Sequence, residues 1–297
     1  MLQALILNVL EQGALAGFLG LGVLVSFRFF RFPDLTAEGS YPLGGAVAAS
    51  LLVAGAGPLL ATLAAIAAGV AAGMTTALIH TKLRINNIIA GIIVMTALYT
   101  VNLRVMGRAN VSLLSVQTLF DQATAWTGAS EATVTIVLTA LLLVLAGAAL
   151  AWFMHTDLGL AVRATGENET MIRSLGVDTD RTKLIGLGLS NGAIALSGAL
   201  VAQDHGFADI GMGIGILVTG AAAVMIGEAL FGDGPIERAH RIGSAWYERL
   251  AHLAQRQHQA GFARSRGSTS AASSSAAVIS FRSTGARPTR SASATSS

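Results

Sequence analysis

The stretch ATVTIVLTALLLVLAGAALAWFM, from Ala132 to Met154, decides the fold class of this chain. It contains no charged residue, and about 20 consecutive apolar residues are enough for a helix to cross the hydrocarbon core of a bilayer. The whole chain agrees with it, because 53% of its 297 residues are hydrophobic and only 12% are charged. A soluble domain carries about 25% charged residues. We therefore expect an all-α membrane protein.

Further apolar segments on both sides predict a polytopic transmembrane helix bundle rather than a single anchor. About seven spans are expected, at residues 11–28, 42–56, 58–79, 86–105, 132–154, 184–202 and 213–231. Several of these segments are rich in Gly and Ala, and small residues let helices approach closely in a membrane. A general Ala/Gly bias of the genome would give the same pattern in any one segment, so this pattern does not identify a function.

Basic residues near the ends of the spans predict the orientation. Connections on one side carry Arg28, Arg31, Lys82, Arg84, Arg163, Arg173, Arg181 and Lys183. Connections on the opposite side carry only Arg104 and Arg108. Because short loops rich in Lys and Arg stay in the cytoplasm, we expect the N-terminus outside, residues 155–183 in the cytoplasm and residues 106–131 outside.

The net charge divides the chain into two parts. Residues 1–235, the expected transmembrane domain, carry ten Lys/Arg against fourteen Asp/Glu, whereas residues 236–297 carry nine Arg against two Glu. The basic character therefore lies in the Arg/Ser/Ala-rich segment, which we expect to be largely disordered. A nucleic-acid partner has no support in the body of the chain.

The charged connection at residues 155–183 interrupts the apolar body. Within it, ENETMIRSLG, residues 167–176, predicts a short helix. Glutamates suit its N-terminal end, where the helix dipole favours anions, and Gly176 suits the position just past its C-terminal end. The aspartates of residues 178–180 are expected to cap the following helix.

The short helix is expected to have one apolar side, formed by Met171, Ile172 and Leu175 at helical spacing. A connection that only joined two spans would not need such a side. Two interpretations stay open on the residues alone. The apolar side contacts a partner protein, or it rests on the protein's own bundle or the lipid surface.

The sequence GLAVRATGENETMIRSLGVDTDRTKLIGLGLSNGAIALSGALVAQ, residues 159–203, resembles the cytoplasmic loop and following helix of bacterial ABC-transporter permeases of the branched-chain amino acid and ribose permease superfamily. Residues 29–49, 86–114 and 206–232 resemble further segments of the same family, in the same order. The resemblance implies that the short helix is the coupling helix, which docks into a groove of the ATPase subunit. The coupling residues that it implies are Gly166, Glu167, Asn168, Met171, Ile172, Leu175 and Gly176.

The resemblance also implies a function and a set of partners. The chain would be the membrane-spanning permease subunit of an importer in the bacterial inner membrane, moving a small polar solute, most readily an amino acid. Its expected partners are a cytoplasmic ABC ATPase, a second permease copy or paralogue, a periplasmic or lipid-anchored solute-binding protein, and membrane lipid. The chain has no GxxxxGK[ST] phosphate loop, so the ATPase must be a separate subunit. Neither a cofactor nor enzymatic activity is expected.

Polar residues near the apolar spans are candidates for the translocation path. The segment FPDLTAEGSYP lies between Pro33 and Pro42, and proline disfavours helix at the preceding residue, so we expect broken backbone there. The candidates are Asp34, Thr36, Glu38, Ser40, Asn86, Asn87, Ser190 and Asn191. Each has a structural alternative: an ordinary cytoplasmic turn for the first four, a helix cap for the two asparagines of residues 86–87, and helix-to-helix hydrogen bonds for the last two.

Two other functions remain open at this point. An ion-gradient-driven secondary transporter would also be polytopic, but the chain has no Asp/Glu/His relay within its spans and has the apolar-faced connection instead. The resemblance stops near residue 234, where the family continues with two more apolar helices. Residues 236–297 are therefore either a regulatory tail or the product of a reading-frame shift, and in the second case the chain would be a non-functional truncated permease.

Overall fold

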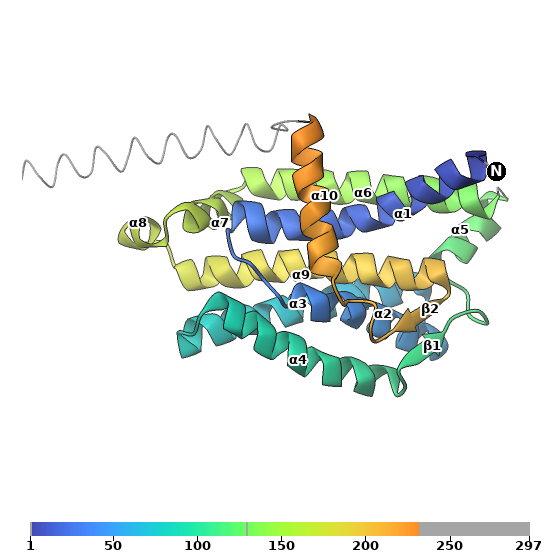
Figure 1. The fold of residues 1–297 in the computed structure, drawn as a ribbon, viewed down its shortest axis with the longest axis horizontal. Helices are drawn as coiled ribbons and strands as arrows, with labels where there is room; N and C mark the ends of the chain where they lie inside the picture. The colour runs from blue at the N-terminus through green and yellow to red at the C-terminus, as the bar shows by residue number, and fades with distance from the viewer. Residues whose placement is uncertain (1, 129, 232–297) are drawn as a thin grey trace, which may run out of the picture. The chain divides into compact units, whose positions relative to one another are not determined.

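The computed structural model describes residues 2–128 and 130–231, so the predicted tail at residues 236–297 lies outside the described residues. Figure 1 shows a bundle of helices with one small pair of strands at its end. The helices are α1 (Leu2–Val23), η1 (Leu24–Phe29, a π-helix), α2 (Ala37–Val53), α3 (Pro58–Leu83), α4 (Asn87–Met106), α5 (Leu119–Thr127), α6 (Glu131–His155), α7 (Asp157–Glu167), α8 (Glu169–Ser174), α9 (Thr179–His205) and α10 (Ile216–Phe231). The strands β1 (Asn110–Ser112) and β2 (Phe207–Asp209) pair antiparallel, with Val111 opposite Ala208.

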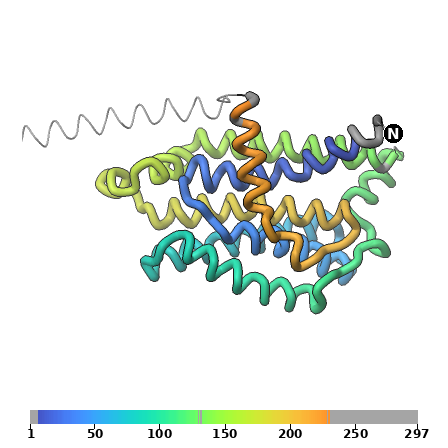
Figure 2. Tube along the Cα trace, viewed as in Figure 1, coloured from blue at the N-terminus to red at the C-terminus, as the bar shows by residue number. Residues whose placement is uncertain are grey.

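Five helices in the described part of the chain are long and apolar enough to cross a membrane. They cover Leu7–Phe29, Pro58–Leu83, Asn87–Met106, Ala132–His155 and Thr179–His205. This result confirms the all-α, polytopic membrane class. The two remaining predicted spans correspond to the shorter helices α2 and α10, and α10 runs across α1 and α9 rather than alongside them (Figure 2). The count of seven spans and the outside position of the N-terminus stay predictions.

The centre of the bundle is α9, which α2 and α3 contact through glycines. A Cβ atom on Gly44 of α2 would collide with the backbone of Ala195, and one on Gly198 of α9 would collide with the backbone of Tyr41. On the other side, Gly73 of α3 lies equally close to the backbone of Leu187. Since apolar burial gives little drive for association in lipid, such close backbone approach is what the dispersion contacts of a membrane bundle require.

The chain between η1 and α2 enters the bundle without regular structure. The Ser26 hydroxyl donates to the Phe32 carbonyl at 2.6 Å, and the Phe32 ring meets the His80 ring edge-on at 5.2 Å. The expected broken backbone is therefore confirmed before α2 begins at Ala37, but it does not extend to Pro42, which lies inside α2. One missing N–H costs one helical hydrogen bond, and neighbouring elements in a membrane bundle compensate for it.

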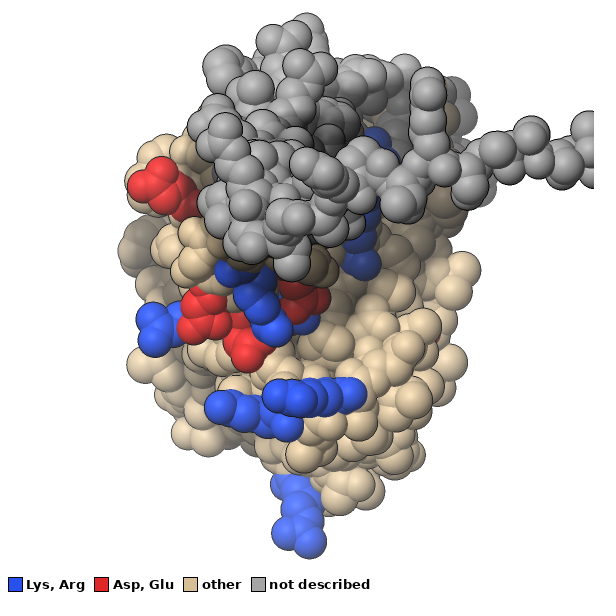
Figure 3. Space-filling model, turned by 90° about the vertical axis from the view of Figure 1, so that its left-hand side faces the viewer, with Lys and Arg blue, Asp and Glu red and all other residues tan. Residues whose placement is uncertain are grey.

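The two ends of the bundle differ in charge. One end carries α7, α8 and the connection between α3 and α4, and Figure 3 views this end and shows Lys and Arg side chains gathered on it. We call it the loop end. The opposite end carries β1, β2 and α5 (Figure 1), and we call it the strand end. All eight basic residues that predict a cytoplasmic location belong to connections or helix ends on the loop-end side.

A labelling experiment tests the predicted orientation. The chain contains no cysteine, so single cysteines report position without background. We expect Thr170→Cys, on α8, to react with a membrane-impermeant maleimide only from the cytoplasmic side, and Ser115→Cys, between β1 and α5, only from outside. Both side chains are exposed. Reaction of Ser115→Cys from the cytoplasm would reverse the whole orientation, because every connection alternates with it.

Candidate functional site

The charged connection at the loop end folds into two short helices. Glu167 is the last residue of α7 rather than the first of the short helix, and Asn168 caps α8 by accepting from the Met171 amide at 3.0 Å. The sequence-based expectation for the N-terminal end was therefore displaced by two residues, because an asparagine side chain caps better than a glutamate. Gly176 ends the helix with a φ of +87°, as expected.

The predicted apolar side of α8 is wrong as a single surface. Ile172 is buried against the protein itself, with 3% of its surface exposed, whereas Leu175 is 59% exposed and Met171 is half-buried. The helix has only six residues, so Leu175 lies in its C-terminal cap, where the backbone leaves helical geometry and turns the side chain outward. Among the three, Leu175 offers the large exposed apolar surface.

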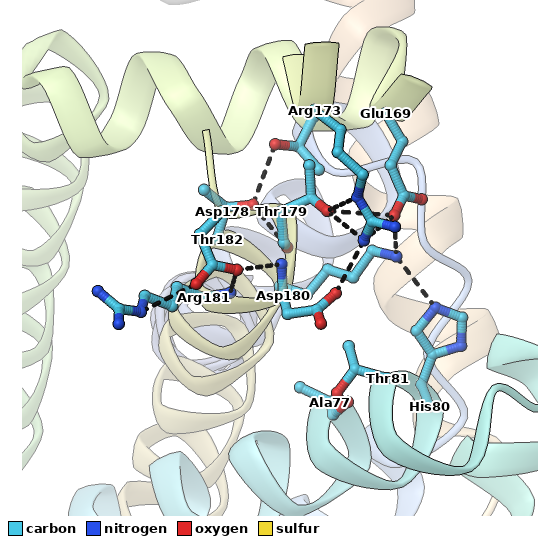
Figure 4. A network of polar contacts seen from close by, with 12 residues as sticks. Ala77, His80, Thr81, Glu169, Arg173, Asp178, Thr179, Asp180, Arg181 and Thr182 are labelled. Carbon is cyan, nitrogen blue, oxygen red and sulfur yellow. Dashed lines mark hydrogen bonds and ion pairs between the residues drawn. The ribbon is translucent and has the colours of Figure 1, made fainter. Parts of the chain in front are cut away.

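A network of ion pairs connects α8 to the start of α9 and the end of α3 (Figure 4). The Lys183 ammonium lies 2.7 Å from Glu169 Oε1 and 3.3 Å from His80 Nε2, and only 10% of its side-chain surface is exposed. Arg173 reaches Asp180 at 3.1 Å and donates to the Thr179 hydroxyl at 2.8 Å. The network therefore joins three helices at the loop end.

The charges of this network affect Glu169. Its partial burial acts to raise the pKa, but the hydrogen bond and charge of Lys183, with Arg173 and Thr179, hold the pKa of the carboxyl below its usual range. A depressed carboxyl pKa means that the interaction is fully present above the ordinary pKa of glutamate and is lost as the pH falls through the lowered value. The network is therefore intact at neutral pH.

The helix α7 is attached to the chain that follows η1. Arg31 and Glu167 form an ion pair at 2.8 Å. A Cβ atom on Gly166 would collide with the backbone of Phe29 and Phe30, so only glycine allows this approach. Of the residues that the resemblance implies for coupling, Gly166 and Glu167 thus contact the protein itself, and Asn168, Leu175 and Gly176 are exposed.

Five of the candidate path residues lie inside the bundle with hydrogen-bond partners. Asn191 Nδ2 donates to Asp34 Oδ2 at 2.6 Å, and its Oδ1 accepts from Ser40 Oγ at 2.7 Å. The Thr36 amide donates to Asp34 Oδ1 at 2.9 Å, and the Thr36 and Thr76 hydroxyls lie 2.7 Å apart. Ser190 donates to the Gly22 carbonyl at 2.7 Å. We call the cluster of Asp34, Thr36, Ser40, Thr76 and Asn191 the buried polar cluster.

The buried polar cluster holds the irregular segment before α2 against α9. At most 1% of the surface of any of its members is exposed. Because each donor has an acceptor, the cluster fits the structural alternative that the sequence left open for these residues. The same holds for Asn86, whose side chain accepts from the Ile88 amide at 2.9 Å and caps α4, with Asn87 accepting from the same amide.

Removing Asp34 is expected to destabilise the protein itself. Asp34→Ala leaves the Asn191 carboxamide and the Thr36 amide without their acceptor, and each unsatisfied buried donor costs about 1–3 kcal/mol. Asp34→Asn keeps one acceptor oxygen and is expected to lose less. Thermal unfolding in detergent measures the effect for both variants. Transport that fails while Asp34→Ala keeps wild-type stability would place this carboxylate in the solute path instead.

Glu38 stands apart from the other candidates because it lines a cavity. The cavity has a volume of about 250 Å³ and lies between the start of α2, the middle of α4 and the chain before α10. Asn102 also lines it, and sequence reasoning missed this residue. A carboxamide inside an apolar span was the signal that could have identified it.

Metal chemistry has no candidate in the described residues, since 2–128 and 130–231 contain no group of three or more His, Cys, Asp or Glu side chains able to hold an ion. The arrangement is that of a membrane bundle with a charged, helical connection at one end and a polar cavity within it.

Comparison with known proteins gives consistent matches. The sequence model of one family, described as "Branched-chain amino acid transport system / permease component", matches residues 5–245. A "Tyrosine transport system permease protein" of Clostridioides difficile is 40% identical over 226 residues, which are 76% of this chain and 74% of the relative. The "Ribose import permease protein RbsC" of Escherichia coli is 28% identical over 233 residues, covering 76% of this chain and 70% of the relative.

An uncharacterized protein of Rickettsia prowazekii is 35% identical over 229 residues, which are 76% of this chain and 78% of that protein. No solved structure matches the chain.

Proposed function

This chain belongs to the family of branched-chain amino acid transport permease components, and from that premise we propose that it forms the membrane pathway of an ABC importer for an amino acid, driven by a separate ATPase. As a permease component it is a multi-pass protein of the bacterial inner membrane and not an enzyme. The observation that carries the proposal is the ion-pair network that fixes α8 to α9 and α3.

The network gives a route from the loop end to the interior. A partner that grips the exposed cap of α8 at Leu175 would displace Glu169 and, through Lys183, the start of α9. Further along α9, Asn191 holds Asp34 in the chain before α2. Because these contacts are short, buried or ion-paired, they move together. An ATPase pair that closes on α8 would therefore shift the beginning of α2 relative to α4, where the cavity lies.

The amino-acid solute rests on two supports. The most informative relative is a permease named for tyrosine transport, and the cavity beside Glu38 presents a carboxylate to any solute that enters it. The remaining proposed partners are a second permease copy or paralogue, which would complete the pathway, and a solute-binding protein at the strand end. The second candidate function, an ion-gradient-driven transporter, would need no ATPase at α8.

Reconstitution separates these two functions. The full chain is expressed with the ATPase encoded beside it, and the complex is placed in liposomes that contain radiolabelled amino acids, the binding protein and ATP on the appropriate sides. We expect the ATPase to co-purify and uptake to require ATP. Uptake that persists without ATP and stops when an ionophore dissipates the ion gradient would instead establish the secondary transporter.

A further inference from the structure

The cavity beside Glu38 combines a half-buried carboxylate with a buried acceptor that lacks a donor. Glu38 is half-buried, and no hydrogen bond or ion pair to its carboxylate occurs among the described residues. Asn102 is 1% exposed; its Nδ2 donates to the Gly39 carbonyl at 3.2 Å, while its Oδ1 has no partner in the described part of the chain. A buried acceptor without a donor costs about 1–3 kcal/mol, which a bound donor would recover.

The other walls add acceptors and apolar surface but no cation. Thr96 donates its hydroxyl proton to the Ile92 carbonyl at 2.8 Å, so its oxygen is left as an acceptor toward the cavity. Pro42 has no N–H to give to the Glu38 carbonyl in the helix. Tyr99, Ile210 and Ile214 supply aromatic and aliphatic surface. No Lys, Arg or His is among the residues that line the cavity.

The local packing keeps this cavity open and its two acceptors in place. A Cβ atom on Gly39 would come within 3.2 Å of the Met95 backbone, so glycine lets α2 and α4 approach until Asn102 reaches the Gly39 carbonyl. Gly213 lies against the Glu38 carbonyl and the Pro42 ring, which brings the chain before α10 over the cavity. These are fixed elements of the bundle rather than exposed loops.

We propose that this cavity binds the primary ammonium group of the transported solute, with the Glu38 carboxylate and Asn102 Oδ1 as its acceptors and with the apolar walls around the carbon atoms next to it. This assignment rests on the proposed function and deepens it. A cavity of about 250 Å³ is smaller than a typical ligand pocket, so it suits one end of a small solute. The solute's own carboxylate, for which the walls offer no cation, would lie outside.

The absence of native cysteine allows a test that does not depend on transport. Thr96→Cys places a thiol in the exposed part of the cavity wall, and Ser115→Cys is the matched control at the strand end. Each full-length variant is treated in membranes with a cationic reagent, 2-aminoethyl methanethiosulfonate, and with an anionic one, 2-sulfonatoethyl methanethiosulfonate. The ratio of the two modification rates reports the charge preference of the site.

We expect the cation-to-anion ratio at Thr96→Cys to exceed that at Ser115→Cys about tenfold or more, as a nearby unpaired carboxylate in a low-dielectric site requires. Adding Glu38→Gln should return the ratio to the control value, while Glu38→Asp, which keeps the charge, should retain most of it. Tyramine and L-tyrosine should slow modification at Thr96→Cys, and 3-(4-hydroxyphenyl)propionate, which lacks the ammonium, should not.

Three results would overturn the proposal: a ratio equal to that of the control, a ratio unchanged by Glu38→Gln, or equal protection by the propionate analogue. Absence of modification by both reagents would also overturn it, since the cavity would then be closed to water. The labelling uses no ATPase. Its failure can therefore be told apart from a failure of ATP-dependent uptake, which would count against the proposed function instead.

Discussion

Replacing Gly44 with valine is expected to remove most of the folded protein from the membrane. Any Cβ atom at this position collides with the backbone of Ala195 in α9, and a backbone atom inside a packed helix cannot move aside as a flexible side chain can. Overpacking a core costs about 1–3 kcal/mol, and contact with backbone places Gly44→Val at roughly the upper end. A loss of about 3 kcal/mol changes the ratio of folded to unfolded protein more than a hundredfold.

Fluorescence-detected size exclusion of a tagged protein measures the folded yield. The matched control is Gly147→Val in α6, where nothing lies within 4 Å of the added Cβ atom, so it makes the same chemical change in a membrane helix without the collision. We expect the control to retain its yield. Equal yields for Gly44→Val and Gly147→Val would show that α2 and α9 do not pack as closely as described.

Replacing Leu175 with aspartate is expected to separate the permease from its ATPase while leaving it folded. The side chain is 59% exposed, so the substitution breaks little within the chain. If the ATPase groove covers it, association loses about 1.5–3 kcal/mol of apolar burial and must also desolvate a charge. At about 1.4 kcal/mol per factor of ten, the complex should weaken by roughly one to two decades or more.

Co-purification of the ATPase with each variant, normalised to membrane yield, measures this effect. Leu114→Asp is the control, because Leu114 is 88% exposed and lies at the strand end. Ile172 is unsuitable for the test, since its burial within the protein means that Ile172→Asp would disturb the loop itself. A Leu175→Asp variant that retains wild-type amounts of ATPase would remove α8 as the docking site.

The local structure of the loop end was largely predictable from the sequence. Short-range signals determine it: an aspartate ahead of α9 caps the helix by accepting from the amides of Asp180 and Arg181, and Gly176 takes the left-handed conformation that ends α8. What the sequence missed was which side of α8 faces the protein. A six-residue helix has too few positions to define a side by periodicity, so packing against the bundle decided it.

Pro42 shows the same limit in the interior. Proline chemistry predicted broken backbone up to this residue, but the helix begins at Ala37 and includes it. The irregular segment is instead fixed by Asp34, which reaches Asn191 across 157 residues of sequence. No local signal identifies such a partner.

The sequence by itself determined that this is an all-α, polytopic membrane protein with a charged connection at one end, because long uncharged apolar runs allow no other structure in lipid. Only the tertiary structure decided that Asp34 is held within the bundle and that Glu38, four residues later, lines a cavity. The two carboxylates look alike in the sequence. Their difference depends on which distant helix each one meets, α9 for Asp34 and α4 for Glu38, and on the glycines that let those helices approach.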